Sequence, residues 1–283
     1  MTELRRRMDE DMIVRGMADR TRETYLWAVA GLATFYHRSP DQITDAEVQA
    51  YLLHLIRDRH RSWSTCNIVV HGLRFFYHTT LKREATTFCI PSPRQPGTLP
   101  ALLSRDEVQR LIAQAPNLKH RTMLLTTYAA GLRLNEVLHL RVGDVDSARM
   151  TIRVEQGKGG RDRYTVLSAR LLDALRAYWT VARPTTWLFP SRSRPRPMDP
   201  SGLQRIYHQA KRRAGITKPG GIHGLRHAFA THLLEAGVDV HTIQRLLGHR
   251  SITTTARYWQ LTHASLSTLA ARLDLLDTPP PQA

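Results

Sequence analysis

The stretch that decides how this chain is interpreted covers residues 223–258 and reads HGLRHAFATHLLEAGVDVHTIQRLLGHRSITTTARY. It sets arginines beside histidines, contains a Gly-His pair, and places a tyrosine at its end. The apolar residues between these polar groups predict two helices, of which the second ends at Gly248. A third helix, begun by Ser251 or Thr253, is expected to carry Tyr258. The question is which ligand needs so many cationic and proton-carrying side chains.

The composition describes a basic chain with room for two domains. It has 283 residues, a formal net charge of +17 and a pI near 10.8. Residues 1–90 carry about +2 of that charge and residues 91–283 about +15. Such a balance usually indicates a polyanion partner, most often nucleic acid, and the alternative is a merely basic surface. A basic helix on a membrane surface is disfavoured, because the cations are dispersed along the chain.

Other features bear on where the protein works. No apolar run approaches the ~20 residues that span a bilayer. The first residues, MTELRRRMDEDM, lack an apolar signal region, so export is not expected. Two cysteines, Cys66 and Cys89, fit a reducing compartment better than a disulfide framework. We therefore expect a cytoplasmic, nucleoid-associated protein.

Proline marks the boundary between two parts of the chain. Residues 15–85 predict helices, with a capping box formed by Thr44 and Glu47. The stretch FCIPSPRQPGTLP, residues 88–100, contains four prolines and a glycine and predicts an extended connector. The predicted domains are a helical N-terminal domain at 1–87, a linker at 88–100 and a C-terminal domain with a tail helix at 101–276.

The second part mixes helices with a short hairpin. Ser104 and Glu107 predict a helix start, and a break at Gly131 separates two more helices. MTIRVEQ and RDRYTVLS alternate around GKGG and predict a β-hairpin. Helices are expected in LLDALRAYWTVA, in SGLQRIYHQAKRRAG and in a tail with an apolar face. The predicted fold class is mainly α: an N-terminal helical bundle, and an α-rich mixed α/β domain with a small β-hairpin or sheet.

Several cations in this part could bind an anion, although each has a simpler explanation. Arg226 lies one turn after His223 at a helix start, where N–H groups and the helix dipole favour a phosphate, or it could pair with a carboxylate. Arg133 follows the glycine break and could merely pair with Glu136. Lys158, between glycines at the hairpin tip, is either solvated or a mobile proton donor in a nucleic-acid groove. The clusters AKRRAGITK and SRSRPRP are expected to contact phosphates.

His249 and Tyr258 complete the set of candidate residues. His249 follows the glycine that ends a helix, and Tyr258 comes nine residues later. Most buried tyrosines are structural. A tyrosine that acts as a nucleophile needs a base and nearby cations, because the pKa of a free phenol is about 10.

Together these motifs resemble the tyrosine recombinase family, the phage-integrase type of site-specific recombinase. The resemblance covers residues 100–262 and is carried by AAGLRLNEVLHLRVGDVD, QGKGGRDR and the 223–258 stretch, in this order and spacing. Residues 15–85 are similar to the family's helical core-binding domain. The resemblance therefore implies a SAM-like core-binding, DNA-binding domain at 1–87 and a catalytic domain at 101–276. The resemblance implies a catalytic set of two phosphate-clamping arginines, a hairpin lysine, two histidines and a tyrosine nucleophile: Arg133, Arg226, Lys158, His223, His249 and Tyr258.

The resemblance also implies a reaction. Tyr258 would attack a DNA phosphodiester, giving a 3′-phosphotyrosyl link and a free 5′-hydroxyl. His223 would accept the tyrosine proton, Lys158 would protonate the leaving oxygen, and His249 would donate a hydrogen bond. Four protomers would act on two double-stranded sites through a Holliday junction. One departure is RYTVL, where relatives often have Val-Pro-Leu, and this bears on the register of the second strand.

The implied chemistry needs neither a metal ion nor ATP. HGLRH is not HExxH, the chain has no GxxxxGK[ST] loop, and arginines would supply the charge of a metal. Two rival functions are a type IB topoisomerase-like enzyme that relaxes DNA and a non-catalytic architectural factor. The complete set argues against the second. DNA integration by a phage, chromosome-dimer resolution, cassette capture and transposition by a mobile element all stay open, although the short stretch before residue 15 favours a simple recombinase.

Overall fold

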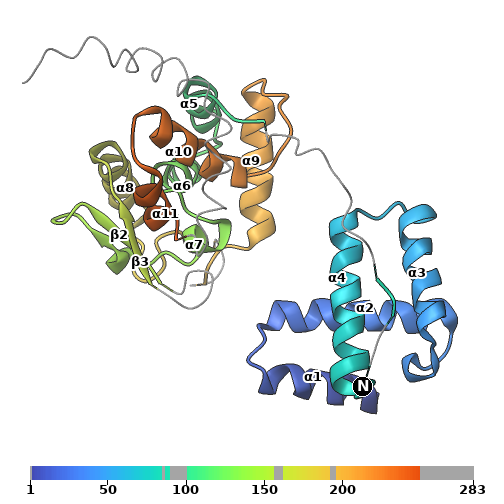
Figure 1. The fold of residues 1–283 in the computed structure, drawn as a ribbon. Helices are drawn as coiled ribbons and strands as arrows, with labels where there is room; N and C mark the ends of the chain where they lie inside the picture. The colour runs from blue at the N-terminus through green and yellow to red at the C-terminus, as the bar shows by residue number, and fades with distance from the viewer. Residues whose placement is uncertain (1, 85–86, 90–100, 156–161, 192–195, 249–283) are drawn as a thin grey trace, which may run out of the picture. The chain divides into compact units, whose positions relative to one another are not determined.

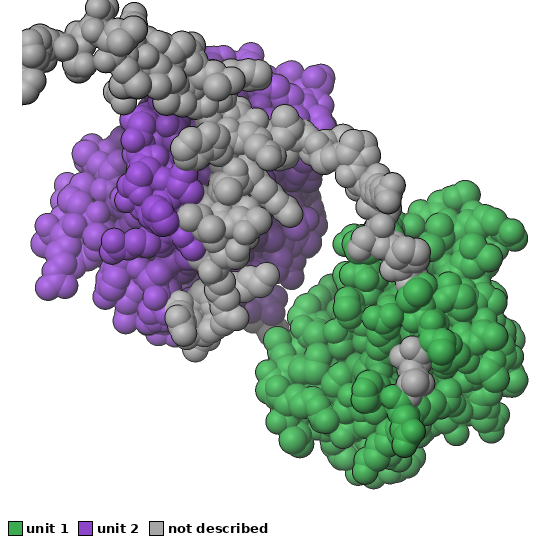
Figure 2. All heavy atoms as spheres, viewed as in Figure 1, with its two compact units in different colours: residues 1–98 green, residues 99–283 purple. Residues whose placement is uncertain are grey.

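The structure is a computed structural model that describes residues 2–84, 87–89, 101–155, 162–191 and 196–248. The chain divides into two compact units, residues 1–98 and 99–283, which are coloured separately in Figure 2. The expected fold class is confirmed: both units are built mainly from helices, and the second also has a small antiparallel sheet.

The first unit is a helical bundle in which α4 runs across α2 (Figure 1). Its helices are α1 Glu3–Val14, α2 Asp19–Tyr36, the 3-10 turn η1 Pro40–Gln42, α3 Asp45–Arg57, α4 Trp63–Arg74 and the π-helical continuation η2 Phe75–Thr80. The predicted capping box starts α3, because the Glu47 amide donates to the Thr44 hydroxyl and the Thr44 amide donates to the Glu47 carboxylate.

The core of this unit is formed by one face of its helices. Four side chains on one face of α3 are buried: Val48, Tyr51, Leu52 and Leu55. On α2, Val29 and Leu32 are buried, but Phe35 is 40% exposed. The Phe35 ring lies at the edge of the core, where it packs against the rings of Tyr51 and His54.

Helix α1 lies in residues to which the sequence patterns assigned no structure. Its apolar signal is weak, since only Met8 and Met12 of its twelve residues are buried. These two methionines belong to the core of the first unit. Arg7 also donates to the carbonyl oxygen of Thr80 at the end of η2. Contacts with distant residues therefore hold this helix in place.

The second unit surrounds a separate core with seven helices among the described residues. They are α5 Arg105–Ala113, α6 Leu118–Ala129, α7 Leu134–Leu138, α8 Ala169–Ala182, α9 Pro200–Arg213, α10 His223–Glu235 and α11 Val240–Leu247. Ser104 and Glu107 form the predicted capping box of α5. The 3-10 turn η3 Val142–Asp144 leads from α7 into the sheet.

The sheet contains the predicted hairpin and one further short strand, in the order β1 Val145–Asp146, β2 Thr151–Val154, β3 Arg163–Val166. Ile152 is paired with Thr165, and Val154 with Arg163. The Thr165 hydroxyl, which is buried, donates to the carbonyl oxygen of Ala130 at 2.9 Å. The register of the second strand is therefore set without the Val-Pro-Leu sequence, and it turns Arg163 toward the same face as Thr165.

Two other expectations concern the ends and connections of the chain. Residues 90–100 of the predicted linker, the hairpin tip at 156–161 and the predicted tail helix lie outside the described residues. Within the described part of the chain, no helix combines the length and apolar character that crossing a membrane requires.

Candidate active site

The site is built around the predicted break between α6 and α7. Gly131 has a φ of +61°, and a Cβ atom built there would lie 2.4 Å from Cδ1 of Phe229 on α10. Only glycine therefore allows the chain to reverse this close to α10. The chain then enters α7 at Arg133, whose backbone N–H donates to the Glu136 carboxylate at 2.7 Å.

Arg226 joins this break to the end of α11. It lies in the first turn of α10, and its side chain is 1% exposed. Nη1 donates to the carbonyl oxygen of Gly131 at 2.7 Å, and Nη2 donates to that of Leu247 at 2.6 Å. One guanidinium thus connects two segments that are 95 and 21 residues away from it in the sequence.

Glu136 lies at the centre of the site and is almost fully buried. Its Oε1 accepts from Arg133 Nη1 at 2.7 Å and from Arg163 Nη1 at 2.8 Å. Its Oε2 accepts from Arg163 Nη2 at 2.8 Å, as well as from the Arg133 amide, and Arg226 Nη1 lies 3.7 Å away. The simpler interpretation of Arg133, a pair with Glu136, is therefore part of the geometry.

The ionic environment keeps this carboxylate charged. Burial alone would raise the pKa of Glu136, but the hydrogen bonds and charge of Arg163, with those of Arg133, lower it to about 2. Three guanidinium groups and one carboxylate leave the cluster with a net positive charge. Such a cluster attracts an anion with several oxygens, such as a phosphodiester.

Two histidines add neutral imidazoles at the start of α10. The rings of His223 and His227 meet edge to face with centroids 4.8 Å apart. Burial, followed by the charges of Arg226 and Arg133, lowers the pKa of His223, although part of this residue reaches solvent. Burial and the neighbouring His223 lower the pKa of His227 to about 4. At neutral pH both rings are therefore uncharged and can accept a proton.

Arg163 is the site residue that the sequence patterns did not indicate. It starts β3, its side chain is 10% exposed, and besides Glu136 it binds the carbonyl oxygen of Leu246 through Nε at 2.9 Å. The sequence signal that could have indicated Arg163 is the alternation of side chains along β3. Arg163 and Thr165 occupy one face of this strand, and its other residues point outward.

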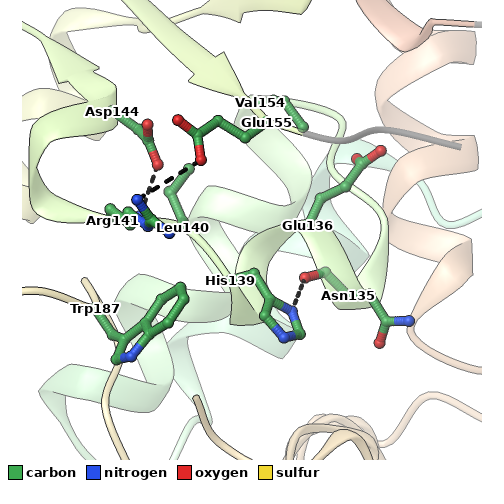
Figure 3. Close-up of a pocket in the computed structure, with 9 residues that line it drawn as sticks. All are labelled: Asn135, Glu136, His139, Leu140, Arg141, Asp144, Val154, Glu155 and Trp187. Carbon is green, nitrogen blue, oxygen red and sulfur yellow. Dashed lines mark hydrogen bonds and ion pairs between the residues drawn. The ribbon is translucent and has the colours of Figure 1, made fainter. Parts of the chain in front are cut away.

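A cavity of about 300 Å³ adjoins the cluster at Glu136, which is one of its lining residues (Figure 3). Arg141 lies in its wall, 3.8 Å from Glu155 and with its guanidinium 5.2 Å from the centre of the Trp187 ring. Arg133, His223 and Arg226 do not line this cavity. Of the cluster residues, Glu136 alone lines this cavity.

Two lysines expected at phosphates have another role. Lys211 is 8% exposed, and its Nζ donates to the carbonyl oxygens of Lys218 and, at 3.1 Å, Gly220. Lys218 donates to the carbonyl oxygen of Leu102 at 2.8 Å and to Glu107 at 2.6 Å. These two lysines brace the loop that leads into α10. The phosphate contacts expected of the AKRRAGITK cluster stay a prediction.

The structure thus gathers Arg133, His223 and Arg226 around Glu136. The other three predicted site residues, Lys158, His249 and Tyr258, lie outside the described residues. In the described part of the chain, no group of three or more His, Cys, Asp or Glu side chains could hold a metal ion.

Fold and site define a class: a mainly helical protein of two units, the second with an arginine-rich cluster at a glycine break. Comparison with known proteins gives the family. Residues 101–265 match the Phage integrase family, and residues 4–87 match the Phage integrase, N-terminal SAM-like domain. The chain belongs to the phage integrase family of tyrosine recombinases, which cleave and rejoin DNA.

Individual relatives agree with this assignment. The putative integrase/recombinase y4qK of Sinorhizobium fredii is 42% identical over 282 residues, which cover 99% of this chain and 92% of that protein. The tyrosine recombinase XerA of Pyrococcus horikoshii is 33% identical over 216 residues, covering 75% and 74% of the two chains. Among solved structures, a XerA recombinase is 29% identical, with a TM-score of 0.56 and coverage of 95% and 97%.

A lambda integrase tetramer bound to a Holliday junction shares the fold at 19% identity, with a TM-score of 0.74 and coverage of 89% and 75%. The resemblance inferred from the motifs is therefore confirmed at the level of family and fold.

Proposed function

We propose that this recombinase holds the scissile phosphate of DNA with Arg133 and Arg226 and attacks it with Tyr258. The observation that supports the proposal most directly is the convergence of the two arginines on one carboxylate, Glu136. That convergence leaves an excess of positive charge where a phosphodiester would gain negative charge during cleavage.

The proposed step exchanges one phosphoester for another. The Tyr258 oxygen bonds to phosphorus, the bond from phosphorus to the 5′-oxygen breaks, and the DNA 3′ end remains on the protein. The tyrosine proton passes to His223, and Lys158 supplies a proton to the 5′-oxygen. A 5′-hydroxyl from a second strand reverses the step and releases Tyr258. The link keeps the energy of the phosphodiester, so the step consumes no ATP.

The state of His223 supports its role as the proton acceptor. The lowered pKa keeps the ring neutral near pH 7, and only a neutral imidazole can take a proton from a phenol. His249 would hydrogen-bond a non-bridging oxygen of the phosphate. Arginine charge takes the place that a metal ion has in other phosphoryl-transfer sites, so the proposal includes no metal or other cofactor.

We further infer that four copies of the chain act together on two double-stranded DNA sites, in the cytoplasm at the nucleoid. A net charge of +17 supports binding to DNA. The lambda integrase neighbour is a tetramer on a Holliday junction, which supports the assembly. The domain roles follow the same proposal: residues 1–87 bind the core DNA, residues 88–100 link the domains, and residues 101–276 catalyse.

The rival of a type IB topoisomerase-like enzyme is not favoured. The N-terminal unit matches the SAM-like domain of phage integrases over residues 4–87, and the curated relatives are integrases and recombinases. Sedimentation of the protein on its DNA distinguishes the two functions, because relaxation needs one protomer and recombination needs four.

The proposal is tested by capturing the covalent intermediate. Cells that express the chain are lysed in denaturant, the protein is isolated, and the DNA attached to it is quantified and sequenced. The recovered sequence is then made as a nicked duplex for cleavage with purified protein. We expect Tyr258→Phe to abolish the adduct and leave DNA binding unchanged. Tyr164→Phe is the matched control, because Tyr164 is 61% exposed on β3.

Two results would contradict the proposal. An adduct that persists in Tyr258→Phe would show that another residue is the nucleophile. Loss of cleavage in EDTA, with recovery on adding a divalent cation, would show that the reaction requires a metal ion.

A further inference from the structure

Arg163 joins three separate segments of the chain at the site: β3, α7 and the end of α11. Its guanidinium makes three hydrogen bonds, and all three nitrogens are used. Two go to the Glu136 carboxylate on α7, at 2.8 Å each, and one goes to the Leu246 carbonyl in the last turn of α11, at 2.9 Å. Arg163 itself starts strand β3.

The lone pairs of Glu136 show what Arg163 does to the other arginines. An ionised carboxylate has about four acceptor sites. Arg163 fills one on each oxygen, and Arg133 fills the other two with its backbone N–H and Nη1. Arg226 Nη1 stays 3.7 Å from Oε2, beyond hydrogen-bond reach, and donates to the Gly131 carbonyl instead.

The end of α11 is held in the same way. The carbonyls in the last turn of a helix lack helical partners and carry partial negative charge. Arg163 binds that of Leu246, and Arg226 binds that of Leu247. The chain then turns at Gly248, which has a φ of +63° and where a Cβ atom would lie 2.7 Å from Cδ of Arg163. Arg163 therefore packs directly against the backbone where α11 ends.

We propose that Arg163 is a positioning residue for strand cleavage: it occupies both oxygens of Glu136 so that Arg226 keeps its place between Gly131 and Leu247. The proposal rests on the function proposed above, because it assigns Arg226 to the phosphate. Without Arg163, two acceptor sites on Glu136 would open. Arg226 Nη1 would then move from the Gly131 carbonyl to the carboxylate, which would displace the guanidinium that clamps the phosphate.

A purely structural ion pair is the alternative for Arg163. Such a pair would hold β3 against α7 and α11 and affect folding alone. The two roles differ in what happens when Glu136 is also changed. If Arg163 acts on the reaction through Glu136, replacing Arg163 should cost no further cleavage rate once the carboxylate is gone. If Arg163 only supports the fold, the rate losses of the two single variants should multiply in the double variant.

The experiment is a double-mutant cycle on single-turnover cleavage of the nicked duplex at saturating protein. We expect Arg163→Gln to slow adduct formation by about 10- to 100-fold, the range typical of groups that orient functional side chains. DNA affinity should change by less than about 3-fold, because the Arg163 side chain is 10% exposed and its three nitrogens bind groups of the protein. The double variant Arg163→Gln with Glu136→Gln should cleave no more slowly than the slower single variant.

Arg153→Gln is the matched control. Arg153 lies on the neighbouring strand β2, is paired with Tyr164 on the opposite face of the sheet, and is 41% exposed. It should cleave at the wild-type rate. If Arg163→Gln does not fold, Arg163→Lys replaces it in the cycle. The single nitrogen of an ammonium group lacks the planar fork with which the guanidinium reaches both carboxylate oxygens and the Leu246 carbonyl. Arg163→Lys should therefore still cleave about 10-fold more slowly.

The outcomes separate this inference from the proposed function. A wild-type protein that forms no adduct contradicts the proposed function, and the role of Arg163 falls with it. If the wild type reacts, a wild-type rate in Arg163→Gln or Arg163→Lys overturns only the inference. Rate losses that multiply in the double variant also overturn it, because they would show that Arg163 and Glu136 act independently.

Discussion

Replacing Glu136 by glutamine removes the one carboxylate that three arginines share. Glutamine keeps the shape of the side chain but has a single acceptor oxygen, and it sets an amide NH₂ against a guanidinium. The Arg226 and Arg163 side chains, at 1% and 10% exposed, would then lie buried without their counter-charge. We therefore expect Glu136→Gln to destabilise the second unit strongly at neutral pH.

Two lines of reasoning give the size of the effect. Removing one partner of a buried ion pair typically costs about 3–5 kcal/mol. Independently, the pKa of Glu136 falls from 4.5 to about 2 on folding, and at 1.36 kcal/mol per pKa unit this corresponds to roughly 3 kcal/mol. Glu136 is 7% exposed, so little of this is lost to solvent screening. We expect a loss of about 3 kcal/mol in the free energy of unfolding.

The sign of the pH dependence follows from the direction of the shift. Because folding lowers the pKa of Glu136, its contribution is fully present above pH 4.5 and is lost as the pH falls toward 2. Wild type and Glu136→Gln should therefore differ by about 3 kcal/mol at pH 7 and converge as the pH approaches 2.

The assay must report on the second unit alone. Urea unfolding followed by hydrogen exchange and mass spectrometry of peptides from α6 and α10 meets this need. Glu155→Gln is the control, because Glu155 is 33% exposed and its pairs with Arg141 and Arg153 lie near the surface. It should cost less than about 1 kcal/mol. A Glu136→Gln variant within about 1 kcal/mol of wild type at pH 7 would refute the account of the buried cluster.

Two further predictions concern the glycine break and the brace under α10. Gly131→Ala should cost about 2–4 kcal/mol in the same unfolding assay, because its Cβ would collide with Phe229 in a left-handed backbone; an unchanged midpoint would contradict the close approach. Lys211→Met should lower stability by about 1–3 kcal/mol and leave DNA affinity unchanged, since Lys211 is spent on two carbonyl oxygens. Arg212 is the exposed neighbouring residue, so Arg212→Gln should leave stability unchanged, weaken DNA binding and reduce its salt dependence. Identical behaviour of the two variants would contradict the different roles of Lys211 and Arg212.

The sequence by itself determined the local structure of this protein. The capping boxes at Thr44 and Ser104, the break at Gly131 and the strands on either side of the hairpin tip are all present where the patterns predict them. Each depends on residues within a few positions of one another, so a short window contains the whole cause. The motifs also determined the family, because their order and spacing are properties of the chain.

Tertiary structure alone decided how the cations are used. Arg163 and Lys211 have the same charge as the arginines that are expected to bind phosphate, yet both donate hydrogen bonds to groups of the protein itself. The partners of Arg163 are 27 and 83 residues away from it, and one of those of Arg226 is 95 residues away. A carbonyl oxygen has no sequence signature, since every residue carries one. Which cation meets which acceptor is therefore settled only when the helices pack.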